Sequence, residues 1–245
     1  MKFAHSLLVG GACALLPFAA AGAQTVYYGQ NDAGTVNSAI SNASSNFFSA
    51  LAGNVGTETF ESLALGTSSP ITLTFPGAGD ATLVGNSQVV SGNNSGAVPY
   101  SGSQYLLTIT GSSGSEFRIN FVNPVAAFGF YGSDIGDAGS NLILRYTRQD
   151  GSTYDSQVPY DYNTQPLANG NLLFYGFIDT ANPFTSIQFL STASGDYFGF
   201  DNMTIASKGQ VVNPPGMVPE PSTVALVGAG VLALGAAARR RARAG

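Results

Sequence analysis

Short segments in which apolar and polar residues alternate make up most of this chain, and their period of two limits the fold more than any other feature. Ile71–Phe75 and Thr185–Phe189 are examples. Side chains two residues apart lie on one face of a β-strand, so alternation predicts strands with one buried face. Clusters of Gly, Pro, Asn, Asp and Ser, such as Pro76–Asp80 and Gly92–Gly96, separate these segments and predict turns. Asp150-Gly151 predicts a hairpin for the same reason.

This pattern predicts an all-β fold. Many short strands joined by frequent turns are typical of a sandwich, and the sequence favours a jelly-roll-like β-sandwich. Gln24–Gly34 is predicted as a short extended lead-in with turn residues. The predicted strands are Thr57–Phe60, Ile71–Phe75, Ala81–Val84, Ser87–Val90, Gln104–Ile109, Glu116–Phe121, Val125–Tyr131, Asn141–Thr147, Thr153–Val158, Leu172–Ile178, Thr185–Phe189 and Tyr197–Ile205.

The segment Asn37–Leu51 has a different period and predicts one short N-terminal helix. Its apolar residues recur at three- and four-residue spacing, with Ser and Asn on the opposite face: Ile40, Ala43, Phe47 and Leu51. We expect this helix to cap an open end of a sheet.

Three triplets place a glycine between two aromatic residues: Phe128-Gly129-Phe130, Tyr175-Gly176-Phe177 and Phe198-Gly199-Phe200. In a strand the two rings of each triplet lie on one face, and the glycine leaves bare backbone on the other. We expect the rings to fill the core, and the glycine face to admit close approach by another element or a ligand.

The first residues, Met1–Ala23, predict a secretory signal peptide. Leu7–Phe18 is an apolar centre of the right length, and Ala21-Gly22-Ala23 is a small-residue cleavage site. Cleavage is therefore expected before Gln24.

Removal of this segment leaves an exported chain with an unusual composition. The only cysteine and the only histidine, Cys13 and His5, leave with it. Residues 24–218 then carry thirteen acidic and four basic residues, a formal charge of −9. No basic patch is available to neutralise phosphates, so nucleic acid is not expected as a partner.

The same composition narrows the possible chemistry. Nucleophilic schemes that use Ser–His–Asp or Cys–His need an imidazole, and zinc hydrolysis needs His or Cys ligands. A paired-carboxylate glycosidase needs only two acidic residues and stays open as an alternative. No acid pair has a distinctive local pattern, so we expect a protein that is not an enzyme.

The C-terminal region has three parts in a fixed order. Val218-Pro219-Glu220-Pro221 is followed by the uncharged apolar run Thr223–Ala238 and then by Arg239-Arg240-Arg241-Ala242-Arg243. Two prolines keep the first part out of regular helix and sheet. At about 1.5 Å per residue, a helix of this length falls short of, or barely reaches, a hydrocarbon core of about 30 Å. The arginines are expected to stay cytoplasmic, which places the rest of the chain across the inner membrane.

This arrangement resembles the PEP-CTERM sorting domain of Gram-negative bacteria. The resemblance rests on Val218, Pro219, Glu220 and Pro221, on the apolar run, and on Arg239, Arg240, Arg241 and Arg243. It implies recognition and cleavage by an exosortase, a membrane-embedded enzyme. The expected division is a signal peptide at 1–23, a sandwich at 24–208, a linker at 209–217 and a sorting tail with a transmembrane helix at 218–245.

Parts of the exported domain are also similar to known proteins. Thr59–Glu61, Phe128–Asp134 and Phe198–Asn202 resemble blocks of PEP-CTERM exported sandwich proteins, and resemble at fold level the first and last strands of jelly-roll carbohydrate-binding modules.

Four acidic residues beside strong strands are candidate metal ligands: Glu61, Asp134, Asp137 and Asp201. First and last strands often come close in a jelly roll, so Glu61 and Asp201 are expected to converge. Oxygen ligands without His or Cys suit calcium. A structural calcium ion and ordinary solvated or turn-stabilising acids are both open.

Four tyrosines in loop-like surroundings, where we expect exposed rings, are candidate glycan contacts: Tyr100, Tyr105, Tyr160 and Tyr162. Their rings could stack on sugars while nearby Asn and Asp bond hydroxyl groups. The alternative is ordinary loop and edge tyrosines.

These observations favour an exported cell-surface or matrix protein of structural type. A calcium-dependent module that binds exopolysaccharide is the first alternative, and a glycosidase is the second.

Overall fold

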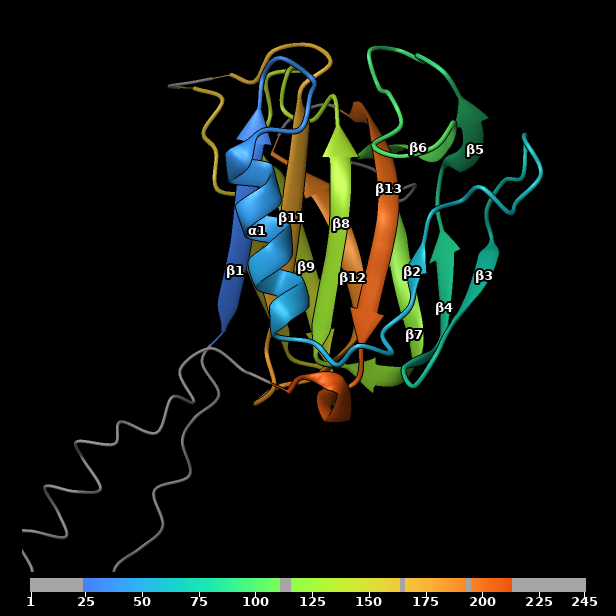
Figure 1. The fold of residues 1–245 in the computed structure, drawn as a ribbon, viewed down its shortest axis with the longest axis vertical. Coiled ribbons are helices and arrows are strands. Elements are labelled where there is room, and N and C mark those ends of the chain that lie inside the picture. The colour runs from blue at the N-terminus through green and yellow to red at the C-terminus, as the bar shows by residue number, and fades with distance from the viewer. Residues whose placement is uncertain (1–23, 111–115, 164–165, 193–194, 213–245) are drawn as a thin grey trace, which may run out of the picture.

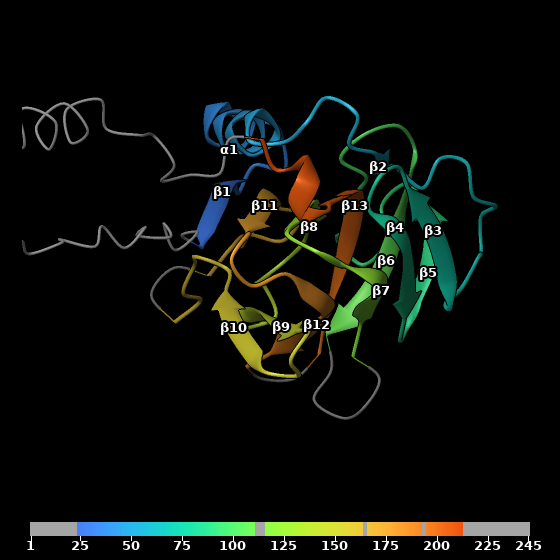
Figure 2. The same cartoon turned by 90° about the horizontal axis from the view of Figure 1, so that it is seen from below.

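The computed structural model describes residues 24–110, 116–163, 166–192 and 195–212. Within them the chain forms two facing antiparallel sheets with one α-helix outside them (Figures 1 and 2). The all-β sandwich with one short helix is therefore confirmed. The predicted signal peptide, the sorting tail and the part of the linker from residue 213 lie outside the described residues.

The first sheet has seven strands. Its order is β1-β11-β8-β13-β6-β5, and β2 pairs with β13 off this path. The bounds are β1 Thr25–Asn31, β2 Thr57–Glu58, β5 Ser87–Ser91, β6 Gln104–Thr110, β8 Ala127–Ser133, β11 Leu172–Ile178 and β13 Asp196–Ala206.

The second sheet has six strands in the order β10-β9-β12-β7-β4-β3. The bounds are β3 Ile71–Phe75, β4 Gly79–Val84, β7 Arg118–Val125, β9 Leu142–Arg148, β10 Thr153–Gln157 and β12 Phe184–Ser191. Among the described strands, β3–β4, β5–β6 and β9–β10 are consecutive strands that pair within one sheet, and β1 and β2 share the first sheet without pairing. The other connections cross from sheet to sheet.

The predicted strands correspond to observed ones, with ends that differ by a few residues. The clearest difference is Gln24–Gly34, which was expected to be only a lead-in. Most of it is the edge strand β1, in register with β11 from Thr25 opposite Ile178 to Asn31 opposite Leu172. Its sequence, TVYYGQN, alternates weakly because β1 is half-buried on both faces.

Aromatic rings fill the space between the two sheets. Phe128 and Phe130 of β8 and Phe200 of β13 point into it together with Phe189 of β12, and all are buried. Their ring centroids lie 5.0–6.4 Å apart, the range in which aromatic pairs attract beyond simple burial. The prediction that these triplets supply core rings is confirmed.

The helix α1, Ser38–Ser49, lies on the outer face of the first sheet, over β1 and β11 (Figure 2). The side chain of Asn37 caps it by accepting a hydrogen bond of 3.0 Å from the Ile40 N–H, the usual role of Asn at this position. The helix was expected to cap an open end of the sheet; instead it covers part of a face.

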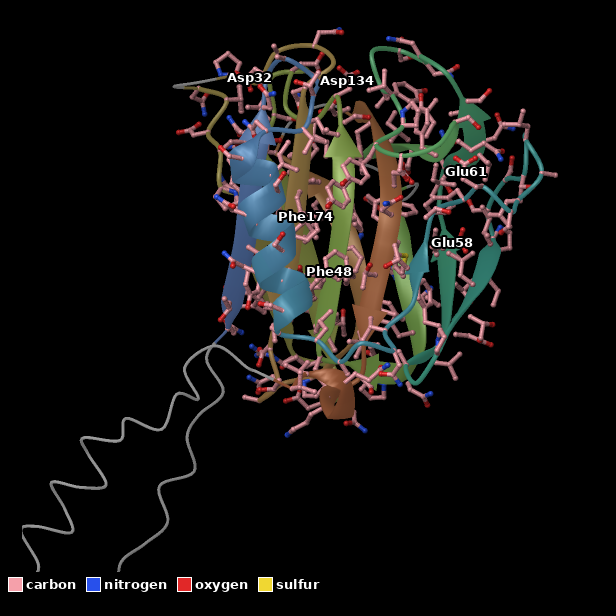
Figure 3. All side chains as sticks on the ribbon, in the orientation of Figure 1. Asp32, Phe48, Glu58, Glu61, Asp134 and Phe174 are labelled. Atoms are coloured by element: carbon pink, nitrogen blue, oxygen red, sulfur yellow. The ribbon has the colours of Figure 1, made fainter. Side chains whose placement is uncertain are left out.

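Two glycines that face each other across β8 and β11 allow α1 to approach. Gly129 pairs with Gly176, and the buried ring of Phe47 lies over both. A Cβ at Gly129 would be 2.8 Å from this ring, and one at Gly176 would be 2.7 Å from it. Figure 3 shows Phe174 and Phe48 at α1, and their ring centroids lie 5.6 Å and 5.5 Å from that of Phe47. The expected close approach at the glycine face is therefore observed, with a helix of the same chain.

The sandwich has two distinct ends (Figure 1). We call the end with the β1–α1 loop and the segment after β8 the loop end. The opposite end, where β1 begins and β13 finishes, we call the base. The 3₁₀-helix η1, Lys208–Gln210, lies at the base.

Ordered packing continues past Lys208, the last residue expected in the sandwich. Gln210 is buried, and Val211 forms a β-bridge with Leu51 at the end of α1. The segment expected to be linker from Gly209 is thus attached to the sandwich as far as Val212. No helix within the described residues is both long and apolar enough to cross a membrane.

Replacing Gly176 by alanine should destabilise the sandwich by about 1–3 kcal/mol, because the added methyl group overpacks the contact with Phe47. Thermal or urea unfolding followed by circular dichroism measures this. Gly53→Ala is the control, since a Cβ there meets nothing within 4 Å. Adding Phe47→Leu to Gly176→Ala should cost less than the sum of the two single changes. Strict additivity would contradict the proposed contact.

Candidate functional site

Asp134, the residue directly after β8, lies at the loop end (Figure 3). Its backbone has a φ of +63°, an uncommon left-handed conformation that Asp tolerates better than most residues. The side chain is only 2% exposed, and Oδ1 accepts a hydrogen bond of 2.7 Å from the Gly170 N–H. Asp134 therefore fastens the segment before β11 to the end of β8.

Gly96 explains why the loop before β6 can pass over this carboxylate. Its φ is +93°, and a Cβ there would lie 2.3 Å from Oδ2 of Asp134. Any side chain at this position would collide with the acid. Burial raises the pKa of Asp134, the Gly170 hydrogen bond opposes this, and the charge of Asp137 adds to the rise.

Asp196, the first residue of β13, completes this group of acids. It is 6% exposed, and its Oδ2 accepts a hydrogen bond of 2.9 Å from the Gly136 N–H. Burial is the main cause that raises its pKa to about 7, with smaller contributions from the charges of Asp137 and Asp134. Sequence reasoning missed Asp196; its position after Gly195, at the start of an aromatic strand, was the available signal.

Glu61 and Asp201 converge, as expected, and both hold the loop before β6. Oδ2 of Asp201 accepts hydrogen bonds from the N–H groups of Tyr100, at 2.9 Å, and Ser101, at 3.1 Å. Oε1 of Glu61 accepts from the next part of the loop, at 2.7 Å from the Ser103 N–H and 2.6 Å from the Gln104 N–H. Two carboxylates thus satisfy four backbone donors of one loop, and bonds of this kind are stronger than neutral ones.

The two carboxylates differ in their surroundings. Asp201 is buried, and burial is the main cause that raises its pKa to about 6 despite three backbone hydrogen bonds; the charge of Glu61 adds to the rise. Glu61 is exposed, and the hydrogen bonds from Gln104 and Ser103 lower its pKa. Asp201 is therefore the member of the pair whose ionisation depends on ordinary changes of pH.

The four predicted calcium ligands do not share one site. Asp134 interacts electrostatically with Asp137 and Asp196, whereas Asp201 interacts with Glu61. Within the described residues no group of three or more acidic, His or Cys side chains is placed to hold a metal ion. In this arrangement the four residues do not fit a common calcium site, because Asp134, Glu61 and Asp201 bind backbone N–H donors. Calcium binding itself stays a prediction.

Two of the predicted glycan contacts, Tyr105 and Tyr160, are buried, so the expectation of exposed rings is wrong for them. The hydroxyl of Tyr105 donates to the carbonyl of Ala97 at 2.8 Å. The hydroxyl of Tyr160 accepts from the Leu142 N–H at 3.2 Å. Both tyrosines anchor loops by their polar ends while their rings fill space under those loops.

Tyr100 and Tyr162 are half-buried. The ring of Tyr100 stacks on that of Tyr131, with centroids 3.4 Å apart and planes 13° apart, so one of its faces is already covered. Tyr162 packs against the core. The four tyrosines therefore do not form a shared exposed platform.

Tyr197 of β13 is the tyrosine that projects into solvent, with 48% of its surface exposed. It lies opposite Ile109 of β6, and Leu107 of the same strand lies opposite Gly199. Exposed Gln88 of β5 pairs with Leu107. Sequence reasoning treated Tyr197 as an ordinary strand residue, because its exposure depends on which face of β13 is covered.

Residues 218–241 match the family model of the PEP-CTERM protein-sorting motif. The chain therefore carries a PEP-CTERM sorting motif near its C-terminus. No curated protein matches the chain.

Several solved structures are similar to the sandwich. A family 22 xylan-binding domain from Paenibacillus barcinonensis is 16% identical, with 67% of this chain and 98% of that chain covered and a TM-score of 0.41. The K2 cleaved adhesin domain of Lys-gingipain is 14% identical, with 62% and 97% covered and a TM-score of 0.38. Likenesses of this size do not carry a function from one protein to another.

The stability of the sandwich should rise as the pH falls from 8 to 5. Between the ordinary Asp pKa of about 3.9 and the raised pKa values of Asp196 and Asp201, the folded chain binds protons that the unfolded chain does not. Stability is therefore highest below the folded pKa values and is lost as the pH rises through them.

Asp196→Asn tests this. The variant should be more stable than the parent at pH 8 and similar to it at pH 5, because the amide keeps an acceptor for Gly136 without a charge. Melting temperatures across this range give the comparison, with exposed Asp150→Asn as control. An unchanged dependence on pH in Asp196→Asn would contradict the raised pKa.

Proposed function

We propose that this protein is an exported, non-catalytic protein of the cell surface or extracellular matrix, sorted and processed through its PEP-CTERM tail. The match at residues 218–241 is the observation that carries the proposal. The precursor is held in the inner membrane with its sandwich in the periplasm, and an exosortase releases it. The mature chain then reaches the surface or the surrounding matrix.

The exported domain suits this role. It has no cysteine once the predicted signal peptide has left, so it needs no oxidation to fold. Its stability rests on a core of buried rings and on loops fixed to the sandwich by carboxylates. The repeated crossing of the chain between sheets supports the jelly-roll-like assignment.

The geometry of the acids supports a non-catalytic role over a glycosidase. A glycosidase needs two carboxyl groups that face the substrate from either side of the bond to be cleaved. Here Asp134, Asp196 and Asp201 are buried and each accepts a hydrogen bond from a backbone N–H. These side chains hold loops in place.

The sorting role is tested in the host bacterium by replacing Arg239, Arg240, Arg241 and Arg243 by alanine. The variant should accumulate as uncleaved precursor in the inner membrane, because the positive cluster that fixes the topology is gone. Replacing Pro219-Glu220-Pro221 by alanines should have the same result. Immunoblots of membrane and surface fractions measure precursor and mature forms.

A triple exchange of exposed residues in the sandwich, Val36→Ala, Leu65→Ala and Tyr197→Phe, is the matched control and should be processed normally. If both tail variants mature and reach the surface like the parent, the sorting proposal is wrong.

Exopolysaccharide binding is a second candidate function, and exposed Tyr197 favours it. Its ring stands on the outer face of the first sheet beside half-buried Leu107 and Ile109. Gln88 lies opposite Leu107, and its Nε2 donates to the Gly66 carbonyl and to Oγ of Ser68, both at 3.2 Å. Aromatic rings of this kind stack on the apolar faces of sugars while amides bond the hydroxyl groups.

Tyr197→Ala should abolish retention of the purified exported domain on the exopolysaccharide of its host. Tyr197→Phe should keep it, because stacking needs only the ring. Pull-down with insoluble polysaccharide measures retention, with Val36→Ala as an exposed control distant on the chain. Equal retention of Tyr197→Ala and the parent would exclude this surface.

A further inference from the structure

The chain leaves the sandwich through a short segment that is fixed at the base. After β13, the side chain of Gln210 turns inward: its Nε2 donates to the carbonyl of Pro76 at 2.9 Å, and its Oε1 accepts from the Ser207 N–H at 3.0 Å. Gly77, with a φ of +74°, makes room, since a Cβ there would lie 2.7 Å from Nε2 of Gln210.

Backbone pairing fixes the next residues to the end of α1. The Ala52 N–H donates to the carbonyl of Gln210 at 2.8 Å, and the Val212 N–H donates to the carbonyl of Ala50 at 2.9 Å. We call residues 207–212, with their partners at 50–52 and 76, the exit clamp. It has side-chain and backbone bonds to two separate elements, so it holds the chain at one defined point.

The predicted new N-terminus lies at the same end. The side chain of Gln24 donates from Nε2 to Oδ2 of Asp179 at 2.8 Å, and Thr25 begins β1 opposite Ile178 at the end of β11. Figure 1 shows the start of β1 and η1 both at the base. The two segments that the sequence assigns to the membrane thus join the sandwich at one end.

Little chain separates the exit clamp from the sorting motif. Residues 213–217 are the five residues between Val212 and Val218. Even fully extended, this length spans only about 20 Å at 3.3–3.6 Å per residue. A folded domain of this size has a diameter of about 40 Å, on the usual scaling of the radius of gyration. An enzyme that holds the motif therefore also holds the base close by.

We propose that the exit clamp presents the sorting motif so that the base of the sandwich lies against the membrane-embedded processing enzyme during cleavage, with the loop end directed away from the membrane. This inference rests on the proposed sorting function. The enzyme is the partner at the base because the apolar run starts at Thr223, directly after the motif. The catalytic groups must therefore act at the membrane surface, between the sandwich and the bilayer.

The distance is tested with the full-length precursor in its host. Deleting residues 213–216 should cause a several-fold rise in the ratio of precursor to mature protein, because the sandwich then collides with the enzyme before the motif reaches it. Replacing the same residues by Gly and Ser at equal length should leave the ratio unchanged, and so should a long Gly/Ser insertion. Normal processing of the deletion variant would overturn the inference.

Opening the clamp should reverse the defect. In the deletion variant, the changes Gln210→Gly, Val211→Ser and Val212→Gly release the clamped residues as additional linker, and the mature form should return. A thermal melt of the exported domain with these changes checks that the sandwich stays folded. Failure of the folded variant to recover would show that distance from the clamp does not limit cleavage, and would overturn the inference.

The orientation is tested by cysteine labelling, for which the chain is well suited because Cys13 lies in the predicted signal peptide. Two exposed valines mark the two ends. Val122 is 71% exposed and neighbours Asn123, whose side chain contacts Ala78 in the turn beside Gln210. Val36 is 50% exposed in the β1–α1 loop.

In spheroplasts, a membrane-impermeant maleimide should label Val36→Cys in the precursor that keeps residues 213–216 but label Val122→Cys poorly, because the enzyme that holds the motif covers the base. Protection of Val122→Cys should disappear when the processing enzyme is removed. Protection that persists without the enzyme would assign the base to the bilayer, and equal labelling of both sites would show that the base is free; either result overturns the inference.

The processing assays distinguish failure of this inference from failure of the sorting function. If the arginine variant also matures normally, the sorting function fails as well; if only the deletion variant matures, the inference alone fails.

Discussion

Aromatic rings packed between the two sheets stabilise a chain whose single cysteine cannot form an internal disulfide. Phe189 of β12 and Phe200 of β13 belong to the two facing sheets, and Phe117 lies directly before β7. The centroids of these three rings lie 4.9–5.8 Å apart. Each large ring buries much apolar surface, and edge-to-face contacts add to this. The glycines between these rings leave the outer face bare at Gly129 and Gly176, and α1 packs there through Phe47.

The acidic residues stabilise the structure in a second way, by accepting hydrogen bonds from the backbone of the loops. A domain with a formal charge of −9 repels itself, yet several of its carboxylates are drawn inward where backbone N–H groups are available. Asp134 and Asp196 each accept such a bond at the loop end, Asp201 does so from the middle of β13, and Glu61 accepts two more at the surface. Loops without regular pairing must satisfy their donors in some way, and here acidic side chains in and beside the strands supply the acceptors. Burial raises the pKa of Asp196 and Asp201 as the consequence.

Local pattern predicted the elements well and the site poorly, for one physical reason. The helix and most strands follow from the period of the apolar residues, and Asn37 supplied a recognisable cap. The convergence of Glu61 and Asp201 also followed from the expected closeness of first and last strands. The exposure of the tyrosine side chains could not be predicted in this way. Tyr105 and Tyr197 have similar neighbours in sequence, yet a loop covers Tyr105 and leaves Tyr197 exposed. Which strand face is covered depends on distant segments, so no local signal separates the two tyrosines.

The same dependence on distant segments determines that the first and last strands meet at one end of the sandwich. Within the described residues, the first strand could begin and the last strand could finish at opposite ends of the sandwich. Here β1 begins where β13 finishes, because Thr25 and Ala206 both lie near the Ile178–Ala127 pair. The exit clamp then fixes the chain beyond β13 to the end of α1 and to the turn after β3. In the orientation that we propose, the sandwich folds with its loop end directed away from the membrane, and cleavage at the motif releases it without turning it over.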